Sequence, residues 1–287
     1  MILIADSGST KTDWALVRRE AGLDGVSHIS TLKTQGLNPF HQGVDAMTHI
    51  LNEELLPQLD ANEVDVVYFY GSGVRPELEP QMCEILSCVF PHAKSVKAHS
   101  DLLGAAHALC RHTEGIACIL GTGASSCLFD GERIVQSTPA LGYILGDEGS
   151  GAVLGRLFLN ALYKGVLSEK IKDDFENSMG LTMPSVIDRV YRQPLANRFL
   201  ASLSEFIHHH ITDEAVKALV VSNFEAFFSR NIKPYRRPEL PVSFVGSIAY
   251  YYQQQLSEAA HRQHFRLGTI IKSPLEGLVE SCLATMD

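Results

Sequence analysis

The sequence lacks the patterns that would point most directly to nucleic acid or to a bound metal. Its 24 Lys and Arg residues are outnumbered by 33 Asp and Glu residues, for a net charge of -9, and they form no long basic run. A surface that follows nucleic-acid phosphates is therefore not expected. The six cysteines include no C-x-x-C pair and no matching histidine framework. We therefore expect buried free thiols rather than a zinc or redox centre.

The sequence also lacks a leader segment and a long hydrophobic run. It reaches Asp6 without a basic segment, and the apolar stretch 151–167 is interrupted three times by charged or amide side chains. Neither a signal peptide nor a membrane-spanning helix is predicted. We expect a cytoplasmic protein with small-molecule partners and no nucleic-acid or membrane partner. Self-association as a homodimer is left open.

The length and composition indicate a globular protein with two domains. At 287 residues the chain exceeds the roughly 100–150 residues of a common domain. Its hydrophobic fraction of 45% and charged fraction of 20% are typical of globular proteins. Short apolar segments predict strands at 1–6, 12–19 and 26–33, which suggest an antiparallel meander. Strands and helices alternate after these, which indicates an α/β sheet.

The opening pattern returns in the middle of the chain. The segment 116–135 again contains an apolar strand, a tight turn of Gly, Ser and Thr, and a second strand. Aligning Gly8 with Gly123 gives a weak internal repeat. Such a repeat suggests a duplicated domain.

These patterns predict where the domains lie. We expect an N-terminal domain over 1–113 and a C-terminal domain over 114–287, packed together with a cleft between them. Apolar residues at helical spacing predict an all-helical insertion over 151–231 in the second domain. The final helix, 274–287, is allowed to pack back on the N-terminal domain.

Both repeated turns are rich in glycine and hydroxyl side chains. The first offers backbone N–H groups, hydroxyls and Lys11 to a phosphate. Neither is a Walker loop, and the second fails the dinucleotide pattern because Ser126 stands where a third glycine is required. One such turn is an ordinary hairpin connection, but two facing each other can grip a polyphosphate from both sides. Asp6 is placed to hold Mg2+ through water, because Mg2+ uses few carboxylates and keeps much of its hydration.

Six short motifs follow one another in a specific order: Asp6–Asp13, Gly36–Pro39, Ser100–Asp101, Gly121–Gly123, Gly146–Ser150 and Val245–Ser247. Through these motifs most of the chain resembles the actin-like ATPase superfamily, and specifically its N-acetylglucosamine kinase branch. One departure is Ser7, where many relatives have a glycine. The resemblance implies an α/β fold of duplicated ribonuclease-H-like domains with an interdomain cleft and a helical elaboration in the second domain. It also implies the cofactors ATP and Mg2+.

The resemblance implies a role for each matching residue. The first phosphate loop would consist of Gly8, Ser9, Thr10, Lys11 and Thr12. The second phosphate loop would consist of Gly121, Thr122 and Gly123, and the nucleoside would lie against Gly246 and Ser247. Asp6 would serve the metal ion. The sugar would be bound by Asn38, Ser72, Asp101, Thr122, Asp147 and Glu148.

Asp101 has two interpretations. A carboxylate at a helix start commonly caps the helix and interacts favourably with its dipole, and position alone favours this role. The resemblance reverses the preference, because the matching aspartate of sugar kinases orients the attacking hydroxyl and accepts its proton. The transition state of phosphoryl transfer is loose, so positioning matters more than base strength and no raised pKa is required.

The other acceptor residues have similar alternatives. In the segment 146–151, Asp147 or Ser150 could simply cap the following helix, whereas the resemblance makes Asp147 an acceptor for ring hydroxyls. Glu148 would act likewise or stay structural. Asn38 would bind a hydroxyl or acetamido group, or would serve as a turn residue before Pro39.

The sequence therefore predicts an ATP-dependent sugar kinase of amino-sugar metabolism, which phosphorylates an N-acetylated hexosamine, first of all N-acetylglucosamine on its 6-hydroxyl. Asp101 would align that hydroxyl for in-line attack while Mg2+ and the amides of both loops neutralise the phosphates.

Three alternatives remain. An N-acetylmuramic acid kinase would need a cation for the lactyl carboxylate, and Arg75 is the one candidate. An activator-type ATPase of a CoA-ester dehydratase or reductase would need cluster cysteines, for which the spacing of Cys83 and Cys88 is poor. A non-catalytic sugar sensor is disfavoured because Asp101 and both phosphate loops are retained.

Overall fold

The computed structural model describes residues 1–8, 10–19 and 26–284. It divides into two compact units. One contains Met1–Arg111 together with the C-terminal segment that begins at Pro274, and the other contains His112–Ser273. No helix of the described residues is long and apolar enough to cross a membrane.

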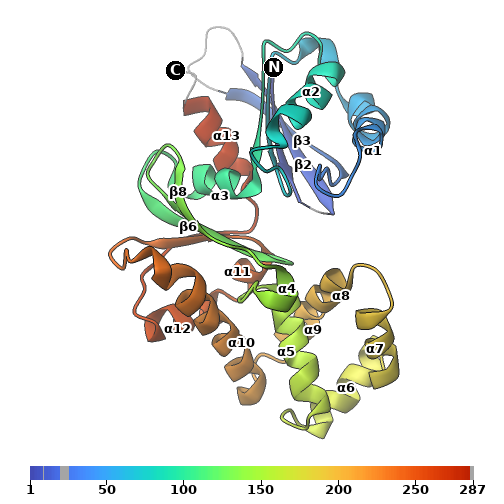
Figure 1. The fold of residues 1–287 in the computed structure, drawn as a ribbon, viewed down its shortest axis with the longest axis vertical. Helices are drawn as coiled ribbons and strands as arrows, with labels where there is room; N and C mark the ends of the chain where they lie inside the picture. The colour runs from blue at the N-terminus through green and yellow to red at the C-terminus, as the bar shows by residue number, and fades with distance from the viewer. Residues whose placement is uncertain (9, 20–25, 285–287) are drawn as a thin grey trace. The chain divides into compact units, whose positions relative to one another are not determined.

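The first unit is built on a five-stranded sheet of order β3-β2-β1-β4-β5 (Figure 1). Strands β1, β2 and β3 form an antiparallel meander, while β4 and β5 run parallel to β1. The bounds are Ile2–Ser7 for β1, Lys11–Arg19 for β2, Val26–Gln35 for β3, Val66–Gly71 for β4 and Ser95–Ser100 for β5.

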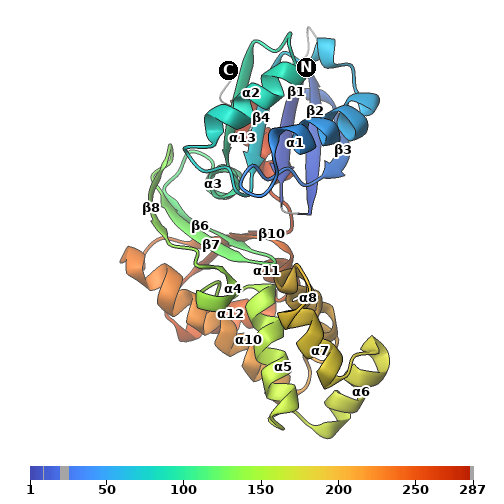
Figure 2. The ribbon, with the colours of Figure 1, turned by 45° about the vertical axis from the view of Figure 1, so that its right-hand side comes forward.

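The sheet of the first unit is buried on both faces, and the apolar residues of β1 are therefore continuous rather than alternating. Leu3 and Ala5 belong to a core with helices α1 (Val44–Ile50) and α2 (Glu79–Val89). Successive side chains of a strand point to opposite faces, so Ile2 and Ile4 point the other way. On that side lie α3 (Asp101–Cys110) and α13 (Leu275–Ala284), as Figures 1 and 2 show.

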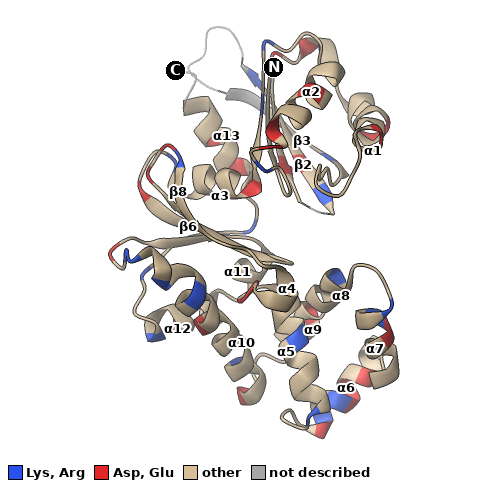
Figure 3. Ribbon diagram, in the orientation of Figure 1, with Lys and Arg blue, Asp and Glu red and all other residues tan. Residues whose placement is uncertain are grey.

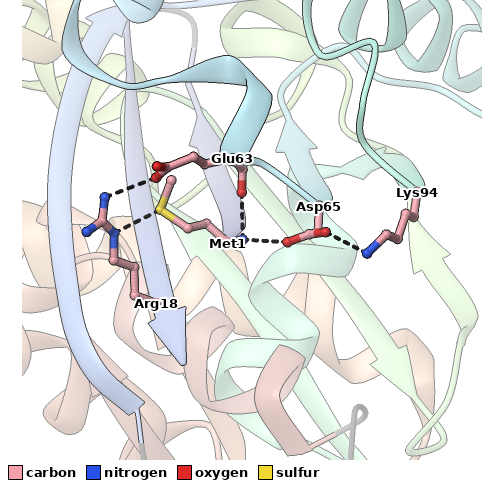
Figure 4. Close-up of polar contacts among 5 residues, drawn as sticks. All are labelled: Met1, Arg18, Glu63, Asp65 and Lys94. Carbon is pink, nitrogen blue, oxygen red and sulfur yellow. Dashed lines mark hydrogen bonds and ion pairs between the residues drawn. The ribbon is translucent and has the colours of Figure 1, made fainter. Parts of the chain in front are cut away.

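The parallel strands of the first unit are fixed at the edge where they begin. The α-amino group of Met1 donates hydrogen bonds to the Glu63 carbonyl and to Asp65 Oδ2, both at 2.7 Å, and Lys94 Nζ lies 2.8 Å from Asp65 Oδ1 (Figure 4). Hydrogen bonds from Lys94 and from the α-amino group lower the pKa of Asp65 to about 2. Met1, Asp65 and Lys94 precede β1, β4 and β5, so this network joins the starts of three neighbouring strands.

The second unit repeats the strand arrangement of the first. Its sheet has the order β10-β9-β6-β7-β8, with β6, β7 and β8 antiparallel and with β9 and β10 parallel to β6. The bounds are Gly115–Leu120 for β6, Ala124–Phe129 for β7, Ile134–Thr138 for β8, Val242–Val245 for β9 and Leu267–Ile271 for β10. The duplicated domain that the sequence repeat suggested, and the α/β architecture of ribonuclease-H-like domains that the resemblance implied, are confirmed.

Helices dominate the second unit between β8 and β9. They are α4 (Gly142–Leu145), α5 (Gly151–Tyr163), α6 (Glu169–Met179), α7 (Met183–Tyr191), α8 (Ala196–Ser202), α9 (Ser204–His209) and α10 (Glu214–Phe227), followed by short turns of helix to Tyr235. Helices α11 (Ser247–Tyr251) and α12 (Gln253–Arg262) separate β9 from β10. In Figure 3, Lys and Arg share α6 and α7 with Asp and Glu, so these surface helices carry charges of both signs.

The core of the second unit joins its sheet to these helices. Ile116, Cys118 and Leu120 of β6 are buried with apolar residues of α5, α10 and α12. The rings of Phe158, Phe175 and Phe206 lie 5.3–5.7 Å apart and link α5, α6 and α9. Edge-to-face aromatic contacts at this spacing add stability beyond the area that they bury.

Candidate active site

The parallel strands of the first unit all end at one edge of its sheet. The pairing registers align Ser7 of β1, Gly71 of β4 and Ser100 of β5 in one row. The chain therefore leaves the sheet at neighbouring points, and Ser72 and Asp101 start the two segments that follow β4 and β5. In open α/β sheets, ligands bind at this carboxyl edge.

At this edge Asp101 lies close enough to Asp6 to raise the pKa of Asp6. The pKa of Asp6 is raised to about 7, chiefly because burial disfavours the carboxylate and secondarily because Asp101 and Asp13 repel it, with Lys11 opposing. Burial raises the pKa of Asp101 to about 6, although its carboxylate accepts hydrogen bonds from its own N–H and from that of Leu102. The sequence argument requires no raised pKa at Asp101, but burial at the helix start produces one.

The beginning of α3 shows what Asp101 does structurally. Ser100 is the N-cap residue, and its Oγ accepts a hydrogen bond from the Leu103 N–H at 3.2 Å. Asp101 occupies the first helical position, where the helix dipole favours a negative charge. Ser100 thus caps the Leu103 N–H, while the Asp101 carboxylate accepts the N–H groups of Asp101 and Leu102 at the same helix start.

The first glycine turn is stabilised by its own hydroxyl groups. Ser7 Oγ and Thr12 Oγ1 are 2.7 Å apart and buried, and they also bond the backbone of Leu37 and the carbonyl of Gln35. The Thr12 side chain thus faces the interior, and only its backbone could meet a phosphate. Thr10 and Lys11 are exposed, with Lys11 Nζ 2.5 Å from Asp13 Oδ2. Ser9 lies outside the described residues.

Two of the predicted acceptor residues are tied to this edge. The Ser72 N–H donates to the Ser7 carbonyl at 2.8 Å. Asn38 is nearly buried, and its Oδ1 accepts the Phe40 N–H at 3.0 Å, as expected of a turn residue. Gly73 has a φ of +79°, and a Cβ there would lie only 2.1 Å from Asn38 Oδ1. Glycine at this position therefore allows Asn38 to lie against the loop after β4.

The second glycine turn, Gly121–Gly123, connects β6 to β7 in the second unit. The Gly121 N–H donates to the Gly123 carbonyl at 3.0 Å, which closes the turn. The first two N–H groups of α5 donate hydrogen bonds to carbonyl groups of this turn. The Gly151 N–H donates to the Gly121 carbonyl at 2.8 Å, and the Ala152 N–H donates to the Thr122 carbonyl at 3.1 Å. The start of α5 is capped by Ser150, so the capping role considered for Asp147 or Ser150 belongs to Ser150.

Asp147 and Glu148 hold this region together in different ways. Asp147 has a φ of +53°, and its carboxylate accepts hydrogen bonds from the N–H groups of Gly142 and Ala124. Burial nevertheless raises the pKa of Asp147. Glu148 accepts hydrogen bonds from Arg230 at 2.7 Å and from Asn231 at 3.3 Å. Burial raises the pKa of Glu148, but these bonds outweigh it and leave the pKa below its ordinary value.

Gly246 directly follows β9, at a position where only glycine fits. Its φ is +122°, and a Cβ there would lie 2.3 Å from the carbonyl oxygen of Leu120. The neighbouring Ser247 begins α11 and borders a cavity of about 450 Å³. The cavity is lined by residues of α9 and α11 and by the residue that follows α11: Ser204, Glu205, His208, His209, Ser247, Ile248, Tyr251 and Tyr252. Its polar and aromatic lining suits a flat heteroaromatic ligand.

The residues at the first edge fit a magnesium ion. No group of three or more His, Cys, Asp or Glu among the described residues is arranged to hold a metal. Mg2+ does not require such a group, because it uses one or two carboxylates together with substrate phosphates and water. Asp6, whose neighbours Asp13 and Asp101 are also acidic, is a carboxylate that a cation would stabilise in its ionised form.

Sequence reasoning missed two features of these sites. Asp13 lies opposite Asp6 in the β1–β2 register, and the symmetry of the hairpin around its turn could have identified this pair. The side chains that α9 contributes to the cavity had no such signal, because His208 and His209 are distant in sequence from Ser247.

Comparisons with known proteins agree with this fold. A proposed N-acetylglucosamine kinase from Porphyromonas gingivalis is 45% identical over 100% of both chains, with a TM-score of 0.94. A proposed N-acetylglucosamine kinase from Chromobacterium violaceum is 17% identical over 98% of both chains, with a TM-score of 0.73. An ethanolamine utilization protein from Carboxydothermus hydrogenoformans has a TM-score of 0.53 at 12% identity, over 97% of this chain and 87% of its own.

The last two similarities show the fold alone. No protein-family model and no curated protein matches the chain. The first similarity is of another kind, because it combines 45% identity with complete coverage. The chain therefore belongs to the sugar kinase family that the proposed N-acetylglucosamine kinase of P. gingivalis represents.

Proposed function

We propose that the protein is an ATP-dependent phosphotransferase that acts on an N-acetylated hexosamine, with N-acetylglucosamine and its 6-hydroxyl as the first candidate. The description of the P. gingivalis relative supports the substrate class. The observation that carries the reaction type is the pair of interacting carboxylates, Asp6 and Asp101, at the carboxyl edge of the first sheet.

Asp101 is the residue assigned to the acceptor hydroxyl. Two backbone N–H groups hold its carboxylate at the start of α3, so its orientation is fixed before the sugar arrives. The ionised carboxylate accepts a hydrogen bond from the sugar hydroxyl and takes its proton as the phosphoryl group is transferred. Holding the reactants in line contributes much of the rate in such reactions.

Asp6 is assigned to the nucleotide side of the reaction. When bound, Mg2+ supplies charge neutralisation at the phosphates. The carboxylate of Asp6 would hold the ion, directly or through water. The glycine turns after β1 and β6 would offer backbone N–H groups to phosphate oxygens, which binds an anion without basic side chains.

The nucleoside is assigned to the cavity beside Ser247. Tyr251 and His208 bring aromatic rings to its lining, and His208 Nε2 lies 3.1 Å from the carbonyl oxygen of Tyr251. This contact fixes the orientation of the imidazole ring. A purine base could stack on these rings while the ribose lies toward Gly246.

A substrate panel tests the proposal. ADP release with Mg-ATP would be measured for N-acetylglucosamine, N-acetylmannosamine, glucosamine and glucose, with Asp101→Asn as the background control. Preference for N-acetylglucosamine is expected, and the position of the new phosphate would be identified by NMR. Preference for a sugar without an acetamido group would contradict the substrate class. Slow hydrolysis that no sugar accelerates would contradict the kinase and favour an activator-type ATPase.

A further inference from the structure

An asparagine lies in the apolar interior of the second unit. Asn223 of α10 is 1% exposed, and its helical neighbours Val220, Phe224 and Phe227 belong to the hydrophobic core. Burying an amide group costs free energy unless both its donor and its acceptor find partners. The partners of Asn223 therefore indicate why a polar side chain stands at this position.

Both polar atoms of Asn223 bond the backbone that leads into α5. Its Oδ1 accepts the Gly149 N–H at 2.9 Å, and its Nδ2 donates to the Ser150 carbonyl at 3.4 Å. These two backbone groups require one acceptor and one donor side by side. An asparagine supplies both, whereas an aliphatic side chain of similar size supplies neither.

The face of α10 that carries this asparagine also makes the neighbouring contacts. Gly149 has a φ of +82°, and a Cβ there would lie 2.9 Å from the Cβ of Phe227, one helical turn further along. Arg230 and Asn231 then bond the side chain of Glu148 from a π-helical turn that follows α10. In Figures 1 and 2, α10 lies beside α5, against which it packs. One side of this helix thus holds three consecutive residues, 148–150.

The segment that Asn223 holds is bonded in turn to the second glycine turn. The N–H groups of Gly151 and Ala152 donate to the carbonyls of Gly121 and Thr122. A continuous series of hydrogen bonds therefore runs from α10, through the start of α5, to the turn that would meet the nucleotide phosphates.

We propose that Asn223 is a positioning residue for phosphoryl transfer. Because its side chain is buried, it acts through the backbone of Gly149 and Ser150 on two neighbours, the turn 121–123 and Asp147. Without the amide, the Gly149 N–H and the Ser150 carbonyl lose their buried partners, and the segment shifts to recover hydrogen bonds. The inference rests on the proposed function for the roles of the turn and of Asp147.

Hydrogen exchange and nucleotide binding test this role without depending on turnover. Amide exchange would be followed by mass spectrometry in peptides that cover 147–152 and 121–124, relative to the average of the second unit. The dissociation constant of the non-hydrolysable ATP analogue AMPPNP with Mg2+ would be measured by calorimetry. Asn223→Ala is compared with Asp213→Ala, a matched control that removes the N-cap at the start of the same helix, where the carboxylate accepts two backbone N–H groups.

Asn223→Ala is expected to speed relative exchange in both peptides about 10-fold and to weaken AMPPNP binding about 10-fold. Its kcat/KM for the sugar should fall about 10²-fold, because small displacements of positioning groups lower rates strongly. Asp213→Ala should unfold at a lower urea concentration but keep the natural relative exchange, AMPPNP affinity and kcat/KM.

A second variant separates the hydrogen bonds from the packing. In Asn223→Asp, the protonated carboxyl group supplies a donor and an acceptor, whereas the ionised group supplies no donor for the Ser150 carbonyl. Burial raises the pKa of such a group, so AMPPNP affinity should match that of the natural protein at about pH 5 and fall below it by about pH 8. If Asn223→Ala does not fold, this comparison decides alone.

Three results overturn the inference: natural exchange and AMPPNP affinity in Asn223→Ala, equal losses in Asp213→Ala, or an affinity ratio of Asn223→Asp to the natural protein that does not change with pH. AMPPNP binding that depends on Asn223, in a protein that phosphorylates no sugar, would support the inference and contradict the proposed kinase. The two failures are therefore distinguishable.

Discussion

At the scale of single residues, Asp101 combines a catalytic assignment with a position that burial makes unfavourable for its charge. Its pKa is about 6 instead of the ordinary 3.8. Ionising this carboxylate costs stability in the free protein, whereas in the proposed reaction the ionised form accepts the hydrogen bond of the sugar hydroxyl. Activity and stability should therefore respond in opposite directions to the loss of its charge.

Asp101→Asn is expected to lose about 10²- to 10⁴-fold in kcat, because the amide keeps the size of the side chain but cannot accept the proton. The pKa of Asp101 is higher in the folded protein than in the unfolded chain, so its ionisation destabilises the native state. This destabilisation grows as the pH rises from about 4 to 6 and is complete above that range. The variant should thus gain up to about 3 kcal/mol of unfolding free energy at neutral pH.

Steady-state kinetics and urea unfolding check the two halves of this prediction. The gain in stability should disappear below about pH 4, where Asp101 is protonated in both states. A variant that unfolds more readily than the natural protein at neutral pH would show that its lost activity reflects damage to the fold. Full activity in a folded variant would contradict the assignment of Asp101.

The same pKa predicts how activity depends on pH. Because only the ionised Asp101 can take a proton, kcat/KM for the sugar should fall as the pH drops through about 6. Above that value the acidic limb of the profile should level off. A profile that stays flat down to about pH 5 would show that this carboxylate does not titrate in the rate-determining complex.

At the scale of elements, the ends of the parallel strands determine where chemistry is possible. Gly246 is the sharpest case, because the strand-to-helix connection after β9 passes directly over the Leu120 carbonyl. Gly246→Ala should cost about 3 kcal/mol of unfolding free energy and raise the KM for ATP, since Ser247 and the cavity follow this turn.

Gly165→Ala provides the control for this prediction. Gly165 also has a positive φ, +72°, but no atom lies within 4 Å of its Cβ position. The Gly165→Ala variant should therefore lose only about 1 kcal/mol of unfolding free energy, from backbone strain, and its KM for ATP should be unchanged. Equal costs for the two substitutions, measured by thermal and urea unfolding, would show that the collision at Gly246 is relieved by a shift of the backbone.

The strand ends were predictable from the sequence because local signals mark them. An apolar run that stops at Asp6, a Ser-Asp pair before a helix, and glycines after Leu120 and Val245 can all be recognised without knowledge of the packing. The contacts of Glu148 with Arg230 and Asn231 could not be predicted in this way. They join segments more than 80 residues apart, and their pairing depends on how α10 packs beside α5.

At the scale of the whole molecule, the sequence repeat predicted the duplicated topology because hairpin and turn chemistry is local. Both sheets show the same strand order and the same mixture of antiparallel and parallel pairs. The uses of individual side chains diverge between the copies. Asp6 lies one residue before the end of β1, whereas the aligned Gly121 directly follows β6, so the first copy carries a carboxylate at this point and the second has no side chain there.

The last helix has a consequence for the synthesis of the protein. Helix α13 packs on α3, β1 and β2 of the first unit, yet it follows the whole second unit in the sequence. Residues 112–273 can complete their fold as they leave the ribosome, whereas the unit that was started first must wait for the final helix. The usual order, in which N-terminal domains mature first, is thereby reversed, and a nascent chain leaves part of one face of β1 uncovered until α13 has been synthesised.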